Sequence, residues 1–374
     1  MSKSDEIKRL LEDGGKYKVL SEFSEGANGY AFKARHLPLE RDIFLKVIDA
    51  DAEAEKTFAE PRAVMEAIAS GGCENLVRLH DAEHLTDDFI LMAMEFVDGG
   101  SLNGLIVDCS LGQMDAVKLT LGVLVGLGHL HAARFLHRDV KPGNILVSFT
   151  ETRAVPKLGD FGSVRRLSYG DTCVKASRHS ALYRPPEAWG DDGFFTLSSD
   201  LYQAGVCLYE MVNGPLPYTF DPYMDAQSKK LLKEKGVSSL HDLDAFERSQ
   251  VADGCLERRI KSCRLLELTA PRPYFSMRLA KIIRKATSID MADRYENAFQ
   301  FTNALQAFSS PNWKTVPLGF AADCWNGWDW KVTPVNPEKT AWAVARARTG
   351  SGKFRTHGST SFSAKEACKF VEEL

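Results

Sequence analysis

Short runs of alternating hydrophobic and polar residues fill the first quarter of the chain. Such alternation predicts β-strands, because successive strand side chains point to opposite faces, and the runs are residues 17–23, 30–35, 43–48 and 89–96. Residues 52–69 between them have helical spacing. The pattern predicts a small β-rich lobe over residues 14–95, preceded by a charged lead over residues 1–13.

Helical periodicity prevails from residue 96 to residue 309 and predicts a large helical lobe. Its most apolar run, residues 119–130, is too short to cross a bilayer and predicts a buried helix. Residues 220–273 form a long insertion with charged stretches of helical spacing. We interpret this insertion as solvated helices of the large lobe, and a docking surface is the alternative.

The pattern changes at Pro311, and residues 311–374 predict a small α+β C-terminal domain. Residues 342–347 have the alternation of a strand, residues 349–353 predict a turn, and residues 354–356 continue the hairpin. Ser363 and Glu366 have the spacing of a capping box, which predicts a final helix. Either a core or a partner-binding surface would explain why five of the six tryptophans lie here, at Trp313, Trp325, Trp328, Trp330 and Trp342.

Composition and charge narrow the functional classes. The net charge of -3 over 374 residues argues against a chain dominated by attraction to nucleic acid or membrane surfaces. The eight cysteines contain no Cys-x-x-Cys pair, so they indicate neither a zinc site nor a disulfide framework. The charged N-terminal residues lack the apolar core of a signal peptide. We expect a cytoplasmic protein with reduced thiols, no membrane anchor and no nucleic-acid partner, whereas its oligomeric state is left open.

The candidate chemistry is concentrated in residues 137–144, His-Arg-Asp-Val-Lys-Pro-Gly-Asn, and in the triplet Asp-Phe-Gly at 160–162. Asp139 is suited to accept the proton of an attacking hydroxyl. Asn144 and Asp160 offer oxygen atoms of the kind that Mg²⁺ prefers. Lys141 can neutralise charge on a phosphoryl group. The residue types and their spacing therefore favour phosphoryl transfer from a metal nucleotide.

These motifs resemble those of the eukaryotic-type (Hanks-type) serine/threonine protein kinase family, over about residues 17–308. The resemblance implies a bilobal α+β kinase fold, ATP with Mg²⁺ or Mn²⁺ as requirements, and transfer to serine and threonine hydroxyls of protein substrates, including the enzyme itself. A pseudokinase scaffold or partner-binding module is the alternative function. A small-molecule kinase of the aminoglycoside type is disfavoured by the Asp-Phe-Gly triplet and by Pro185-Pro186-Glu187.

The resemblance assigns a nucleotide site in the small lobe. Residues 23–31 look like the glycine-rich loop, in which Gly26 and Gly29 are retained while Ser24 replaces the first glycine. Lys46 would contact the ATP phosphates and pair with a helix glutamate. Glu60 is the preferred partner, although Pro61 follows it directly, and Glu66 is the competitor.

The adenine pocket departs from the family pattern at two positions. A large and a small side chain have exchanged places at Ala31 and Phe44, which could conserve the pocket volume. We predict that Phe44 forms the roof of the pocket and Leu146 its floor. The resemblance implies three further contacts with the nucleotide. Met94 would be the gatekeeper, backbone groups of the hinge at Glu95 and Val97 would pair with adenine, and Ser101 stands at the position that contacts ribose.

On the substrate side, Lys141 and Ser180 match serine/threonine kinases. Gly143 stands where kinases directed to basic sites often carry glutamate, so a strong preference for upstream arginine is not supported. Arg138 implies an activation segment that a phosphate can order, with Thr172 and Ser177 as the candidate acceptors.

Other family positions read as structural. The resemblance implies that the buried carboxylate of Glu187 pairs with Arg294. It also makes Asp200 a brace for the 137–144 loop and gives His137 a structural rather than a chemical role.

Overall fold

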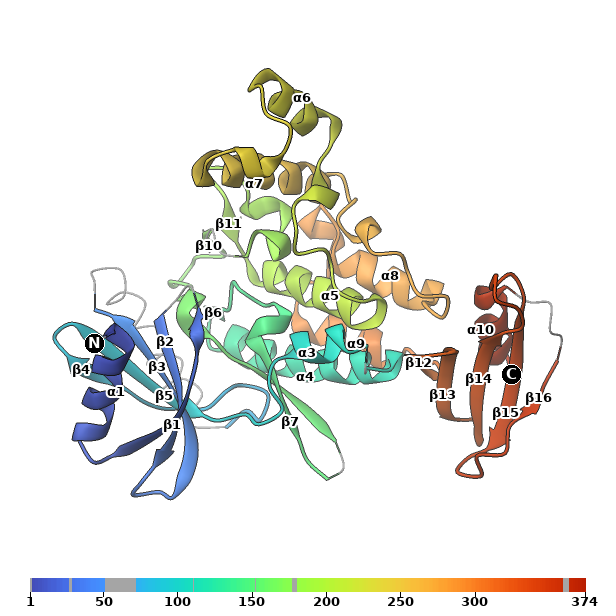
Figure 1. Cartoon of the computed structure of the whole chain (residues 1–374), viewed down its shortest axis with the longest axis horizontal. Helices are drawn as coiled ribbons and strands as arrows, with labels where there is room; N and C mark the ends of the chain where they lie inside the picture. Colours follow the sequence, from blue (N-terminus) through green and yellow to red (C-terminus); the bar gives the residue numbers. More distant parts are fainter. Residues whose placement is uncertain are drawn as a thin grey trace.

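The computed structural model describes residues 2–26, 29–50, 72–109, 111–151, 153–176, 180–358 and 363–374. Three units follow one another along the chain, and the large helical lobe lies between the small lobe and the C-terminal domain (Figure 1). The predicted α+β class with a β-rich first lobe and a helical second lobe is confirmed.

The small lobe contains a five-stranded antiparallel sheet with the order β1-β2-β3-β5-β4. Its strands are β1 (Tyr17–Gly26), β2 (Gly29–His36), β3 (Arg41–Asp49), β4 (Leu79–Thr86) and β5 (Phe89–Glu95). Alternation along β3 places Phe44 and Lys46 on one face of the sheet. On the other face, α1 (Lys3–Asp13) covers a core that includes Ile43, Leu45 and Val47.

The large lobe is organised around two buried helices that pack on each other, α4 (Gln113–Ala132) and α5 (Leu197–Asn213). The predicted buried helix at residues 119–130 lies within α4. Three further helices of the large lobe are α3 (Leu102–Val107), α8 (Met277–Ala286) and α9 (Ala298–Gln306). Within the described ranges, no helix is both long and apolar enough to cross a membrane.

Short strands shape the loops that carry the predicted chemistry. Two of them, β6 (Phe135–Leu136) and β7 (Ile145–Phe149), flank the 137–144 loop. The pairs β6 with β9 (Arg165–Arg166), β7 with β8 (Ala154–Leu158), and β10 (Val174–Lys175) with β11 (Phe194–Phe195) are antiparallel. Short 3-10 turns complete these loops, at Pro142–Asn144, Phe161–Ser163, Ala181–Tyr183 and Pro186–Ala188.

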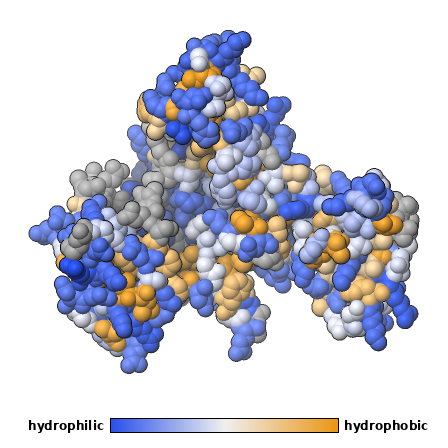
Figure 2. All heavy atoms as spheres, viewed as in Figure 1, coloured by the Kyte–Doolittle hydropathy of each residue, from blue (hydrophilic) through white to orange (hydrophobic). Residues whose placement is uncertain are grey.

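The predicted insertion at residues 220–273 contains two helices, α6 (Ala226–Glu234) and α7 (Ala245–Lys261). They form the part of the molecule that projects at the top of Figure 1. In Figure 2 the surface there is mostly hydrophilic around a small hydrophobic group. Leu232 and Leu256 are buried and belong to the core of the large lobe. The inner faces of these two helices therefore pack on the large lobe.

The C-terminal domain is a five-stranded antiparallel meander with a helix on one face. Its strands are β12 (Asn312–Val316), β13 (Gly319–Trp325), β14 (Trp328–Pro334), β15 (Trp342–Arg348) and β16 (Arg355–Thr356). The predicted final helix is α10 (Ala364–Glu372), which packs against β14 and β15 and begins with the capping box of Ser363 and Glu366. Three tryptophans of the domain are buried, as expected for a packed core: Trp313, Trp330 and Trp342.

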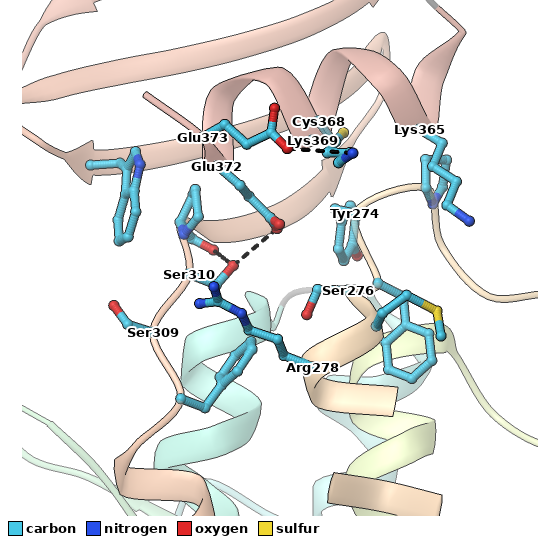
Figure 3. Close-up of a pocket in the computed structure, with 16 residues that line it drawn as sticks. Tyr274, Ser276, Arg278, Ser309, Ser310, Lys365, Cys368, Lys369, Glu372 and Glu373 are labelled. Atoms are coloured by element: carbon cyan, nitrogen blue, oxygen red, sulfur yellow. Dashed lines mark hydrogen bonds and ion pairs between the residues drawn. The ribbon is translucent and has the colours of Figure 1, made fainter. Parts of the chain in front are cut away.

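The C-terminal domain and the large lobe share one continuous hydrophobic core. A polar chain also connects them, because the Gln113 amide donates to the Ser310 hydroxyl at 2.8 Å and that hydroxyl contacts the Glu372 carboxylate at 3.3 Å. Figure 3 shows the contact between Ser310 and Glu372 as a dashed line, with Arg278 of α8 beside them. All three residues line a cavity of about 310 Å³. Burial raises the pKa of Glu372.

Candidate active site

The 137–144 loop is held from below by the fully buried carboxylate of Asp200 on α5. Its two oxygens accept the backbone N–H groups of His137 at 2.9 Å and Arg138 at 2.8 Å, and the ring of His131 lies 2.8 Å away. Burial alone would raise the pKa of Asp200, but the contact with His131 and the backbone donors lower it. The ring of His137 contacts the carbonyl of Gly159 at 3.0 Å. These contacts suit the structural roles that the resemblance implied.

Asp139 lies in the centre of the loop and is almost completely buried. Its Oδ2 atom accepts hydrogen bonds from the Lys141 ammonium at 2.7 Å and from the Asn144 amide at 2.9 Å. Among the described residues, its Oδ1 atom has no hydrogen-bond partner. Lys141 also donates to the Ser180 hydroxyl at 2.7 Å. The structure thus brings together four predicted residues from two separate segments of the chain.

Lys46 reaches the same region from the small lobe. Its ammonium lies 2.8 Å from Oδ1 of Asp160, and both side chains are mostly buried. Burial would raise the pKa of Asp160, but the charge and hydrogen bond of Lys46 outweigh it and lower that pKa. Asp160 adopts the left-handed conformation, with φ 56° and ψ 69°. The predicted partner Glu60 lies outside the described residues, so Asp160 is the ion-pair partner of Lys46 in the part of the chain that can be described.

A cavity of about 670 Å³ lies between the two lobes, where the hinge predicted at Met94 to Val97 connects them. This volume is in the range of small-molecule sites. The ring of Phe44 lines it and packs against Phe23 with centroids 5.5 Å apart. The other predicted residues that line this cavity are Gly29, Ala31, Lys46, Met94, Glu95, Val97, Ser101, Lys141, Asn144, Leu146 and Asp160.

The carboxylate of Glu95 is engaged by residues of the protein itself. It accepts the backbone N–H of Arg78 at 2.7 Å and the ammonium of Lys157 at 3.0 Å. This arrangement agrees with the expectation that backbone groups, rather than side chains, of the hinge would face the base.

Part of the glycine-rich segment lines the cavity, at Phe23, Gly29 and Ala31. Gly26 and Gly29 pair across β1 and β2, and the two residues between them lie outside the described ranges. Gly29 has φ 113°, and a Cβ atom there would lie 2.4 Å from the Val47 carbonyl oxygen. Only glycine fits this close approach of two backbones.

The predicted activation segment contacts Arg138 through its backbone. The guanidinium donates to the carbonyl oxygens of Ser163 at 3.2 Å and Lys175 at 3.0 Å. Thr172 is exposed, whereas Ser177 lies outside the described residues. The pairing of Arg138 with a phosphate on either residue stays a prediction.

The segment that follows Ser180 is fixed by an internal ion pair. The guanidinium of Arg294, which is 0% exposed, donates to the two carboxylate oxygens of Glu187 at 2.8 and 2.7 Å. The Ser199 hydroxyl adds a bond of 2.6 Å to the same carboxylate. The pairing matches the one that the resemblance assigned to these two residues.

Two supporting residues were missed by the sequence reasoning. The side chain of Gln203 on α5 accepts the backbone N–H of Val140 at 3.0 Å, which braces the 137–144 loop a second time. The carboxylate of Glu210 accepts the Tyr183 hydroxyl and the Leu216 N–H, each at 2.8 Å. Both are polar residues within the mostly apolar stretch of α5 from Leu201 to Val212, and that was the available signal.

Comparison with known proteins supports this geometry. A family model described as a protein kinase domain matches residues 17–307. The chain is 33% identical over 222 residues to the probable serine/threonine-protein kinase PknB of Bifidobacterium longum, covering 56% of this chain and 31% of that protein. It is 29% identical over 309 residues to the serine/threonine-protein kinase PknL of Mycobacterium bovis, covering 82% and 68%.

A third relative, the serine/threonine-protein kinase pkn3 of Myxococcus xanthus, is 29% identical over 228 residues, which are 59% of this chain and 41% of that protein. The chain therefore spans less than half the length of two of these relatives and about two thirds of the mycobacterial one. The family model covers far more than half of the chain, and the structure contains the ion pairs Lys46–Asp160 and Arg294–Glu187. The chain belongs to the eukaryotic-type (Hanks-type) serine/threonine protein kinase family.

Proposed function

We propose that this protein transfers the γ-phosphoryl group of ATP to serine and threonine hydroxyls of proteins, including its own. The observation that carries the proposal is the state of Asp139, whose Oδ1 atom is buried and has no hydrogen-bond donor among the described residues. A buried carboxylate oxygen without a donor is costly. A substrate hydroxyl at this position would supply the missing hydrogen bond and place its own proton on the accepting atom.

The remaining contacts of Asp139 support the same role. Its Oδ2 atom is fixed by Lys141 and Asn144, so the carboxylate cannot rotate without losing two bonds. Lys141 bridges from Asp139 to the Ser180 hydroxyl, which keeps a positive charge beside the acceptor position. A cation fixed before the reaction stabilises developing negative charge without reorganisation.

The donor set at the cavity fits ATP with Mg²⁺, and Mn²⁺ would suit it as well. Asp160 contributes a carboxylate whose lowered pKa keeps it ionised at neutral pH. The Asn144 amide nitrogen makes two hydrogen bonds to Asp139, and its carbonyl oxygen is the atom suited to a hard cation. A bound metal would neutralise phosphate charge. Lys46, on the same side of the cavity, would contact the phosphates, and Phe44 and Leu146 would enclose the base.

The experiment is transfer of label from radioactive ATP·Mg²⁺ to general protein substrates, followed by phosphoamino-acid analysis. Wild type should label serine and threonine. Asp139→Asn should retain nucleotide binding and lose at least about 100-fold in rate, the usual contribution of a positioned base. Addition of EDTA should abolish transfer.

The scaffold alternative gives a different result in the same assay. A chain that binds ATP but transfers no label, with either wild type or Asp139→Asn, would refute the proposed activity. Label on tyrosine alone would refute the substrate class.

A further inference from the structure

A second cavity, of about 370 Å³, opens beside the predicted acceptor position. Lys141 and Gly143 line both this cavity and the nucleotide cavity, and Ser180 lies at its edge. The Lys141 ammonium is 2.7 Å from both Asp139 Oδ2 and the Ser180 hydroxyl. A peptide whose hydroxyl reaches Asp139 would therefore carry its neighbouring side chains past the opening of this cavity, which we name the flanking pocket.

Aromatic rings make up much of the wall of the flanking pocket. Tyr183, Tyr218 and Tyr223 contribute rings, and each hydroxyl is already bonded within the protein. Tyr183 donates to Glu210 at 2.8 Å, Tyr218 to the Asn103 amide oxygen at 3.3 Å, and Tyr223 to a backbone carbonyl at 2.6 Å. Because these polar ends are engaged, the tyrosines offer an incoming ligand mainly their apolar surfaces.

The charges that line the flanking pocket also favour an uncharged ligand. Of the described residues that line the flanking pocket, Lys141 alone carries a charge, at the end nearest Asp139, and none carries a carboxylate. The nearby Glu210 is completely buried behind Tyr183, with both oxygens accepting hydrogen bonds. An arginine or lysine side chain would find no ion-pair partner there and would lose its hydration.

The rim of the flanking pocket carries two exposed aromatic side chains. Tyr218 is 59% exposed and Phe220 is 41% exposed. They lie next to the reacting groups rather than scattered over the surface, and covering them with an apolar ligand would remove hydrophobic area from water.

We propose that the flanking pocket binds an uncharged apolar side chain of the substrate, next in sequence or close to the phosphorylated serine or threonine, and that Tyr218 and Phe220 determine this specificity. The inference rests on the proposed kinase function. A hydrophobic pocket of this kind discriminates between large and small apolar side chains by about 10- to 200-fold.

The test uses the full chain and a peptide set with one central serine. Each flanking position is occupied in turn by leucine, phenylalanine, alanine, arginine or aspartate. At one position, leucine or phenylalanine should raise kcat/KM at least about tenfold over alanine, mainly through KM, and arginine should give no such gain. In the Tyr218→Ala/Phe220→Ala variant this ratio should fall to near one, whereas Tyr218→Phe should keep it.

A control is Phe246→Ala, which removes an exposed ring (72%) on α7 outside the flanking pocket. It should leave the leucine-to-alanine ratio unchanged. A wild-type enzyme that phosphorylates the peptides but prefers arginine, or shows no preference, would overturn the proposal while leaving the proposed function intact.

A binding arm separates the two proposals. Fluorescence polarisation with labelled peptides in which alanine replaces the central serine measures the pocket without catalysis. Tighter binding of the leucine peptide, lost in Tyr218→Ala/Phe220→Ala, would support the pocket even if no transfer were seen. Equal binding of the leucine and alanine peptides would overturn it.

Discussion

The N-terminus of helix α4 is capped by a residue of the C-terminal domain. The residue before the helix is Gly112, which has no side chain to accept the first N–H groups. Asn312, at the start of β12, supplies the missing acceptor, because its amide oxygen accepts the N–H groups of Met114 at 2.8 Å and Asp115 at 3.2 Å. Its amide nitrogen donates to the Asp115 carboxylate at 2.9 Å. The other end of α4 leads into the 137–144 loop, so this cap ties the C-terminal domain to the helix that supports the active site.

Two substitutions remove this contact from opposite sides. Asn312→Ala deletes the cap, which should cost about 1 kcal/mol. It also deletes the bond to Asp115, worth about 1 kcal/mol more. Gly112→Ala places a Cβ atom 2.2 Å from the Asn312 amide oxygen, and the three atoms nearest to it all belong to the Asn312 side chain, so Asn312 must turn away. Each variant should therefore lose about 2 kcal/mol and, in a chain of 374 residues that unfolds as one unit, melt roughly 2 to 3 °C lower.

Thermal unfolding followed by circular dichroism, with limited proteolysis of the junction near residue 310, measures both the loss and its location. Because the two units share one core, wild type should unfold in a single transition. The matched control is Asn297→Ala, which removes an exposed cap within α9 that accepts Gln300 N–H at 3.0 Å. It should cost about 1 kcal/mol and should not expose the junction to protease.

The double variant Gly112→Ala/Asn312→Ala decides whether the two substitutions act on one contact. In Asn312→Ala the three atoms that would lie nearest to the new Cβ atom are removed, so the combined loss should be smaller than the sum by at least about 1 kcal/mol. Additive losses, or an Asn312→Ala variant as stable as Asn297→Ala, would refute the reasoning.

Two further predictions concern buried charges. Arg294→Lys keeps the charge but cannot donate to both oxygens of Glu187 at once. Urea titration should therefore show that the free energy of unfolding falls by about 2 to 4 kcal/mol. A fall below about 1 kcal/mol would contradict the importance of the paired geometry. Burial raises the pKa of Glu210 to about 7 from 4.5, so the folded state binds the extra proton and stability falls as the pH rises from about 4.5 through 7. Glu210→Gln should remove about 2 to 3 kcal/mol of the decline between pH 5 and pH 8, and an unchanged decline in urea titrations would argue against this assignment.

The central features of the active site could be predicted because they are local in sequence. Asp139, Lys141 and Asn144 lie within six residues, and a single tight loop brings their side chains together. Lys46 was recognisable as a charged residue inside an otherwise apolar strand, at the position that the resemblance assigns to a phosphate-contacting lysine.

Several elements escaped the pattern reading. β4 (Leu79–Thr86) is an edge strand in which mostly polar residues alternate with few buried ones, so its hydrophobic signal is weak. β12, β13 and β14 were not assigned individually, although the alternation of tryptophan and valine along β14 was present. In β13 three consecutive residues, Phe320 to Ala322, are buried, because both faces of the sheet are covered at that point, and no alternation results.

The sequence by itself determined the fold class, the kinase motifs and the residues that we propose to contact the phosphates and the acceptor, because each motif lies within one loop or one strand. Only the tertiary structure decided that Asp160 meets Lys46, that Gln203 braces the loop, that Asn312 caps α4 and that aromatic side chains surround the flanking pocket. These contacts join residues that are distant along the chain. No local periodicity encodes them, since they depend on how lobes and domains pack against each other.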